Sequence, residues 1–124
     1  MFGLLSRIRS FFSNEIYSNV PASTWFPHKT GIVISRYAKI GSGCWIFNGV
    51  SITSSVFDDE GKRAHRSTPT IEDNVIILHN ATVHGKITIG SGSIILSGAV
   101  VNSSFPPDSI IGGAPAVLLN KRTV

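Results

Sequence analysis

Aliphatic residues recur along this chain with a period of six. In the first half of the chain the series occupies four positions: Ile34, Ile40, Ile46 and Ile52. In the second half it occupies six positions: Ile71, Ile77, Val83, Ile89, Ile95 and Val101. Neither an α-helix nor a strand that alternates between two faces produces this period. It predicts a repeating unit of one short strand and one tight bend, with the periodic residue pointing into the core.

A second apolar or small residue follows four positions after each member of the series, at Ala38, Cys44, Val50, Val56, Val75, Ala81, Ile87, Ser93, Ala99 and Phe105. Glycine and asparagine, which tolerate the backbone of a tight bend, lie between the two positions at Gly43, Gly49, Asn74, Asn80, Gly92 and Gly98. Three such units close a triangular coil, and the coils stack by parallel strand pairing. We therefore expect a solenoid whose apolar residues are buried only when neighbouring coils pack together.

The two halves of the series differ by one residue in register, and residues 57–70 separate them. This stretch, FDDEGKRAHRSTPT, is charged and contains both Gly61 and Pro69, so it predicts a loop extruded from the coil. Two interpretations of the loop stay open: a tolerated insertion, or a wall over a substrate site.

The length of 124 residues predicts a single domain. We divide it into an N-terminal cap (1–19), a β-helix (20–106, with the loop at 57–70) and a closing turn with a C-terminal tail (107–124). The cap is expected to contain a short amphipathic helix with one apolar side, formed by Leu4, Leu5, Ile8, Phe11 and Phe12. That side would cover one end of the domain or contact a membrane or partner.

Charge and cysteine content exclude some classes of protein. The formal net charge is +4, but no basic run is longer than two residues, which argues against a nucleic-acid surface and remains compatible with an anionic small molecule. Cys44 is the only cysteine, so no disulfide forms within the chain, and we expect a reducing, cytoplasmic location. No apolar run approaches the roughly 18 residues of a membrane span.

Two stretches, read with the six-residue period, resemble the hexapeptide-repeat acyltransferases. Residues 27–34, PHKTGIVI, look like the His-x-Thr-Gly-Ile-Val segment of the serine acetyltransferase branch, which also includes sugar O-acetyltransferases of surface-polysaccharide pathways. Residues 106–116, PPDSIIGGAPA, followed by Lys121 and Arg122, are similar to the closing turn of that family. The resemblance implies an all-β fold, a left-handed parallel β-helix, whose handedness is an exception to the usual crossover rule.

The resemblance also implies an activity, an acetyl-CoA-dependent O-acetyltransferase, with His28 as the general base. His28 is in phase with the first series, at a position that should be aliphatic, and an imidazole can accept the proton of an attacking hydroxyl. The residues that the resemblance assigns to coenzyme A are Ser97, Gly98, Gly112, Gly113, Ala114, Lys121 and Arg122. Backbone amides are expected to hold the thioester oxyanion, and no covalent intermediate is expected because Cys44 falls at an inward position.

The sequence departs from serine acetyltransferases in two respects. It lacks their long helical N-terminal region, and it has Ser67-Thr68 before Pro69 where they place a substrate-holding histidine. His65, three residues upstream of Thr68, is the candidate substitute for binding substrate. Because this departure weakens the case for serine, the sequence favours a sugar hydroxyl, as in a surface polysaccharide precursor, as the acceptor.

An alternative function rests on His79 and His84. Their five-residue spacing resembles the paired histidines of γ-class carbonic anhydrases, which share the fold and hold a metal with three histidines. Thr53 occupies the place of the third ligand, so we expect no metal. A third interpretation is a repeat domain that only binds partners, and such a domain would show no affinity for acetyl-CoA.

The resemblance finally implies a homotrimer, with each coenzyme channel lying between neighbouring chains. The expected ligands are acetyl-CoA, as acyl donor, and a small-molecule or glycan acceptor.

Overall fold

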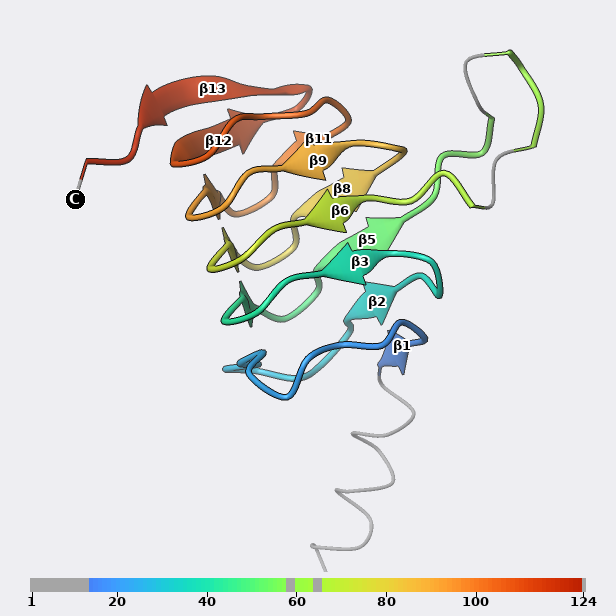
Figure 1. Ribbon diagram of the computed structural model, residues 1–124, viewed down its shortest axis with the longest axis horizontal. Coiled ribbons are helices and arrows are strands. Elements are labelled where there is room, and N and C mark those ends of the chain that lie inside the picture. The colour runs from blue at the N-terminus through green and yellow to red at the C-terminus, as the bar shows by residue number, and fades with distance from the viewer. Residues whose placement is uncertain (1–13, 58–59, 64–65, 124) are drawn as a thin grey trace, which may run out of the picture.

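The computed structural model describes residues 14–57, 60–63 and 66–123. Three sheets form the walls of a solenoid, and between residues 33 and 113 successive strands lie in different sheets (Figure 1). Sheet A contains β1 (Glu15–Ile16), β2 (Val33–Ile34), β5 (Ser51–Thr53), β8 (Thr82–His84) and β11 (Val100–Val101). Sheet B contains β4 (Trp45–Ile46), β7 (Ile76–Ile77), β10 (Ile94–Ile95), β12 (Ser109–Gly113) and β13 (Ala116–Lys121). Sheet C contains β3 (Lys39–Ile40), β6 (Thr70–Ile71) and β9 (Thr88–Ile89).

Coils stack in register through parallel pairing. In sheet A, Glu15 pairs with Val33 and Val33 pairs with Ser51, so one coil takes 18 residues, or three units of six. The same offset joins Thr82 to Val100. Among the strands of the described residues, only β12 and β13 pair in the antiparallel sense, as a hairpin that closes the upper end of sheet B, and an isolated antiparallel bridge joins Phe57 to Arg63 within the loop. The expected parallel β-helix is therefore the observed architecture.

The core is the column of residues that the six-residue series predicted. All ten members of the series are buried, and eight of them are fully inaccessible to solvent: Ile34, Ile46, Ile52, Ile77, Val83, Ile89, Ile95 and Val101. Each short strand buries one aliphatic side chain, which contributes roughly 1.5–3 kcal/mol on removal from water. The second series is buried as well, except that Phe105 is half-buried and Val56 is 72% exposed. The prediction for Val56 is wrong because the chain leaves the coil there, and Pro69 is buried as the chain returns.

The loop interrupts the third coil at the corner between sheets A and C. It leaves after β5 and returns at β6, and in Figure 1 it projects away from the solenoid. Its base is closed by a hydrogen bond from the Ser55 N–H to the Ser67 carbonyl oxygen (3.3 Å). The Arg66 guanidinium lies 5.1 Å from the centre of the Tyr37 ring, which attaches the returning segment of the loop to the second coil.

Two expectations concern the beginning of the chain. The amphipathic helix expected within residues 1–19 lies outside the described residues up to position 13, whereas residues 15–16 of the same segment form β1 of sheet A. Within the described ranges, no helix is long and apolar enough to cross a membrane.

Candidate functional site

His28 lies in the bend between Trp25, which pairs with β4 of sheet B, and β2 of sheet A. Trp25 forms a parallel bridge with Trp45, so Phe26 stands beside the inward Ile46 and packs against the core. Trp25 is eight positions before Val33, whereas Trp45 is six positions before Ser51. The two extra residues displace His28 from the inward position that its register predicted, and its side chain is exposed. The six-residue register therefore does not extend to His28, and Phe26 takes the inward place beside Ile46.

The backbone around His28 is ordered by hydrogen bonds within the bend and to the next coil. The Thr30 N–H donates to the His28 carbonyl oxygen (3.0 Å), and the Gly49 N–H donates to the Thr30 carbonyl oxygen (3.0 Å). Gly31 has a φ of +66°, a conformation that side chains with a Cβ rarely adopt. The Thr-Gly pair after His28 thus builds the sharp bend that presents the imidazole to solvent.

A line of polar residues continues from this bend along the edge where sheets B and A meet. We call this line the polar corner: Thr30, Asn48, His79 and Ser97, one residue from each successive coil. The Asn80 N–H donates to the Asn48 carbonyl oxygen (3.0 Å), and the Gly98 N–H donates to the His79 carbonyl oxygen (3.1 Å). His79 Nδ1 and Ser97 Oγ are themselves hydrogen-bonded at 3.2 Å. His28 and His79 therefore lie along the same edge of the molecule.

Some of the residues expected to contact coenzyme A gather at the upper end of the polar corner. Ser97 and Gly98 are exposed there, and a Cβ added to Gly98 would meet no atom within 4 Å, so the surface over this bend is open. Gly112 is close-packed, since a Cβ there would come within 3.1 Å of Leu96 Cδ1. Gly113, with a φ of +96°, and the exposed Ala114 then turn the chain from β12 into β13.

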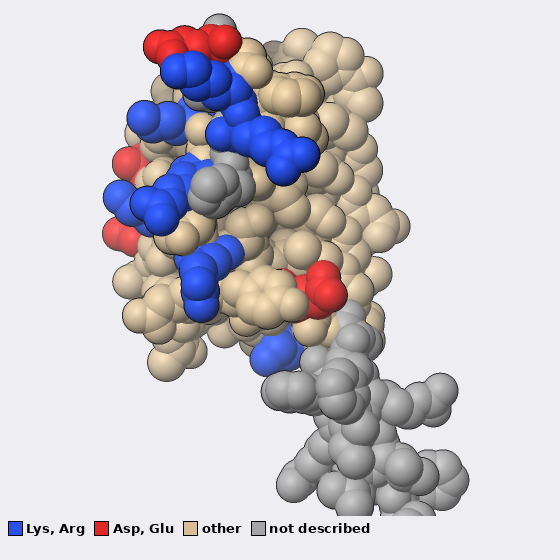
Figure 2. All heavy atoms as spheres, turned by 90° about the vertical axis from the view of Figure 1, so that its right-hand side faces the viewer, with Lys and Arg blue, Asp and Glu red and all other residues tan. Residues whose placement is uncertain are grey.

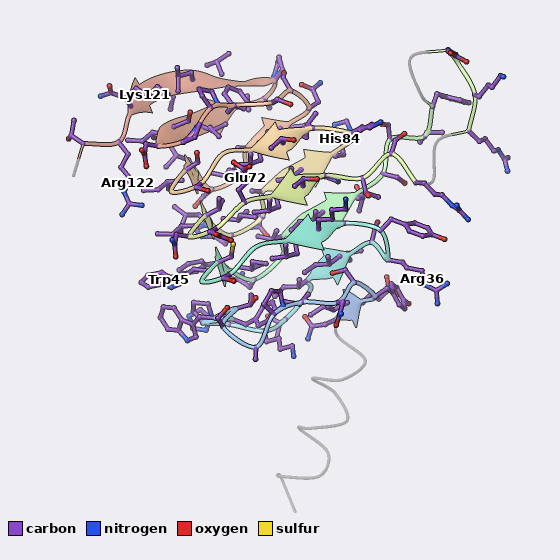
Figure 3. The ribbon with its side chains drawn as sticks, viewed as in Figure 1. Arg36, Trp45, Glu72, His84, Lys121 and Arg122 are labelled. Carbon is purple, nitrogen blue, oxygen red and sulfur yellow. The ribbon has the colours of Figure 1, made fainter. Side chains whose placement is uncertain are left out.

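Lys121 and Arg122 are not part of this group. Lys121 pairs with Ser109 at the start of β12, and its Nζ donates to the Pro107 carbonyl oxygen (3.0 Å). Arg122 Nη1 donates to the carbonyl oxygen of Gly92 (3.1 Å), in a bend between sheets C and B. Both cations therefore lie across the width of sheet B from Ala114, and Figure 3 shows them on the opposite side of the molecule from His84 and Arg36.

A cavity of about 490 Å³ lies under the loop at the corner between sheets A and C. Its walls are mainly polar, and they carry one cation, one carboxylate and one imidazole. The lining residues are Ser55, Phe57, Glu60, Ser67, His84, Gly85, Lys86, Ile87 and Asn102. Figure 2 shows that Lys and Arg side chains gather on the side of the molecule that carries the loop. Loop residues therefore form one side of a cavity, and Ser67, from the segment that departs from serine acetyltransferases, lines it. His65 lies outside the described residues.

Two further sets of candidate residues behave differently in the structure. His79 lies on the polar corner and His84 lines the cavity, at opposite ends of the strand between them, and no group of three or more His, Cys, Asp or Glu suited to a metal occurs in residues 14–57, 60–63 and 66–123. Cys44 is fully buried, and its thiol donates to the Glu72 carbonyl oxygen (3.2 Å). Burial raises the pKa of this thiol, which opposes formation of a nucleophilic thiolate.

Comparison with known proteins agrees with this geometry. Residues 68–103 match the model of the bacterial transferase hexapeptide family (six repeats). The chain belongs to the hexapeptide-repeat transferase family, on its serine acetyltransferase-like branch. Its fold is accordingly the left-handed parallel β-helix that the resemblance implied.

Serine acetyltransferases are among the relatives of this hexapeptide-repeat protein. That of Bacillus subtilis (strain 168) is 34% identical over 115 residues, which are 90% of this chain and 51% of the relative. The structure of the Neisseria gonorrhoeae enzyme superposes with a TM-score of 0.80 at 30% identity, over 99% of this chain and 46% of that one. The soybean enzyme complexed with serine gives 0.79 at 32% identity, over 95% and 47%. The chain thus spans about a third to a half of the curated relatives it matches.

Two features of the site were missed in the sequence. Lys86 and Glu60 were not recognised as lining a cavity, because they come from a coil and a loop that meet only in the folded chain. The apolar outer face of sheet B was missed as well. The residues that form it are apolar and come immediately before inward residues in the sequence, so the pattern was present there. In register across four strands these outward residues are Trp45, Ile76, Ile94 and Ile110.

Proposed function

We propose that this chain transfers the acetyl group of acetyl-CoA to the hydroxyl of a small acceptor. The observation that supports it best is the exposed His28 in its ordered Thr30-Gly31 bend, at the base of an edge whose upper end is the open Gly98 bend. Membership of the serine acetyltransferase-like branch supports the same reaction. The carbonic anhydrase alternative is not favoured by these relatives.

His28 acts as the general base in this proposal. An alcohol is a poor nucleophile while it keeps its proton, and an imidazole near neutral pH can accept that proton as the oxygen attacks the thioester carbon. The tetrahedral intermediate then collapses, the carbon–sulfur bond breaks, and the thiolate of coenzyme A takes up the proton as it leaves. The buried Cys44 takes no part, so the acetyl group passes directly from donor to acceptor.

Acetyl-CoA binds along the polar corner. The open backbone at Ser97 and Gly98 accommodates a pantetheine arm without interfering side chains, and the hydrogen-bonded His79–Ser97 pair offers polar groups to its amides. The closing turn at Gly113 and Ala114 continues this surface. Lys121 and Arg122 contact the donor only if its phosphates cross the upper end of sheet B, so their role stays a prediction.

The cavity under the loop holds the acceptor. The relatives named above are serine acetyltransferases and give no support to the expectation of a sugar or polysaccharide acceptor, and neighbouring structures were solved with serine bound. We therefore propose serine, or a closely similar amino acid, as the acceptor. In the cavity, Lys86 would receive the carboxylate and Glu60 the ammonium group.

The working form is a homotrimer assembled through sheet B. The outer face of sheet B is apolar, with Trp45, Ile76, Ile94 and Ile110 in register. β13 extends this face with three exposed apolar side chains, those of Val117, Leu118 and Leu119. By contrast, the aligned outward residues of sheet C are Lys39, Thr70 and Thr88. An apolar wall of this extent marks an interface, and the polar corner runs along the edge of that wall.

Calorimetric titration of the purified chain with acetyl-CoA tests the proposal first. We expect saturable binding of one donor per chain, followed by thiol release when L-serine is added. A folded protein that binds no acetyl-CoA would refute the proposed function. Binding without thiol release from serine, but with release from another hydroxyl compound, would retain the reaction and replace the acceptor.

A further inference from the structure

The bend that carries His28 belongs to the first coil of the part of the chain that the structure describes, residues 14–57, 60–63 and 66–123. Higher along the same edge, backbone groups of each bend pair with the coil below, as when the Gly49 N–H donates to the Thr30 carbonyl oxygen (3.0 Å). Among the described residues, no earlier coil pairs with the bend at residues 28–32 in this way. It is also the longest of its column, because two extra residues separate Trp25 from Val33. Without other support, this bend would be the least constrained part of the proposed site.

Asn14 supplies the missing contacts through its side chain. Its Nδ2 donates to the Lys29 carbonyl oxygen (2.8 Å), and its Oδ1 accepts from the Ile32 N–H (3.0 Å). The carboxamide thus spans the bend from Lys29 to Ile32, using one donor and one acceptor. The adjacent Glu15 N–H donates to the Ile32 carbonyl oxygen (2.8 Å), so the segment carrying Asn14 is held to the same coil.

We propose that Asn14 is a positioning residue for His28, an inference that rests on the proposed function. Asn14 fixes the residues immediately after His28, and Thr30 N–H in turn bonds to the His28 carbonyl oxygen, so the carboxamide limits where the imidazole can go. A displacement of about 1 Å in a reacting group can reduce a rate by a factor of roughly 100. Asn14 therefore affects the chemical step through the bend, without touching donor or acceptor.

Two variants in the full chain separate this role from general stability. Asn14→Ala removes both hydrogen bonds, and Asn14→Asp keeps the size and the acceptor but loses the donor to Lys29. The matched control is Ser23→Ala, since Ser23 Oγ accepts from the Gly43 N–H (3.0 Å), a similar contact between side chain and bend in a different corner of the first coil. For both Asn14 variants we expect kcat with serine to fall at least tenfold while KM for acetyl-CoA and for serine changes less than threefold.

The control is expected to keep kcat within twofold of the wild type despite a comparable fall in Tm. Nuclear magnetic resonance supplies a readout besides turnover: in Asn14→Ala the Ile32 amide should exchange with solvent at least tenfold faster, and the His28 imidazole signals should shift. A wild-type kcat in Asn14→Ala, or an equal loss in Ser23→Ala, would overturn the inference. If the wild type acetylates no acceptor, the proposed function fails on its own. The positioning of the His28 bend by Asn14 is then tested separately, and unchanged Ile32 exchange and His28 signals in Asn14→Ala would refute it.

Discussion

Trp25 lies beside Trp45 in a parallel bridge, with their ring centroids 4.6 Å apart in an edge-to-face arrangement. This pairing sets the register of the first coil, because it places Phe26 next to Ile46 in the wall of the core. The residues that remain before Val33 must then form a longer bend. His28 is in that bend, and its exposure follows from the position of the two tryptophans.

Replacing His28 with alanine should abolish most of the activity while leaving the fold intact. General bases contribute roughly 10²- to 10⁴-fold to a rate, so we expect kcat/KM with serine to fall at least a hundredfold. The side chain is exposed, so the thermal midpoint should change little. Steady-state thiol release and circular dichroism measure the two effects. Asn19→Ala, an exposed position in the same coil, serves as the control, and a His28→Ala enzyme with more than a few per cent of wild-type turnover would exclude the proposed base.

Placing a charge on the outer face of sheet B should dissociate the trimer. In Ile94→Asp the carboxylate would be buried against a neighbouring subunit at a high desolvation cost. Sedimentation velocity should then show a species of one chain, 13.3 kDa, with little activity. Thr88→Asp makes the matched change on sheet C in the same coil and should remain trimeric. If Ile94→Asp sediments and turns over like the wild type, sheet B is not the interface.

Removing the cation of the cavity should weaken acceptor binding selectively. Lys86 lines the cavity and would pair with the acceptor carboxylate, an interaction that contributes roughly 1–3 kcal/mol when it is a charge-assisted hydrogen bond. We expect Lys86→Ala to raise KM for serine at least fivefold and to leave KM for acetyl-CoA unchanged. Lys39→Ala, on the outer face of sheet C, should alter neither constant. If Lys86→Ala instead raised KM for acetyl-CoA, the cavity would be assigned to the donor.

The thiol of Cys44 should be unreactive in the native protein. It is fully buried, and burial raises its pKa above the ordinary value of 9.0, so little thiolate forms near neutral pH. A chromogenic disulfide reagent at pH 8 should label the thiol only after denaturation. Because the unfolded thiol ionises more readily, the free energy of unfolding should be unaffected below pH 9.0 and should fall as the pH rises above it. Rapid labelling of the native protein would contradict the burial.

Much of the fold and part of the site could be predicted from local pattern. A six-residue unit specifies its own inward residue, which is why Ile77 and Ile95 were placed correctly in the core. The same reasoning failed for Val56 and His28, since both lie where the chain leaves the regular period and the register is set by stacking on another coil. Ser97 and Gly98 were expected on one surface with Lys121, but the hairpin of β12 and β13 carries Lys121 to the opposite edge of sheet B.

The sequence by itself thus determined the repeating unit, the strands, the buried aliphatic column and the place where the loop interrupts the coil. These follow from the order of residues over six positions, and each short strand has only one way to bury its aliphatic side chain. The tertiary structure alone decided which bends form one edge, how the cavity under the loop is lined, and how Asn14 reaches Lys29 and Ile32. These relationships join residues a coil or more apart, and they depend on how successive coils stack, which no local pattern contains.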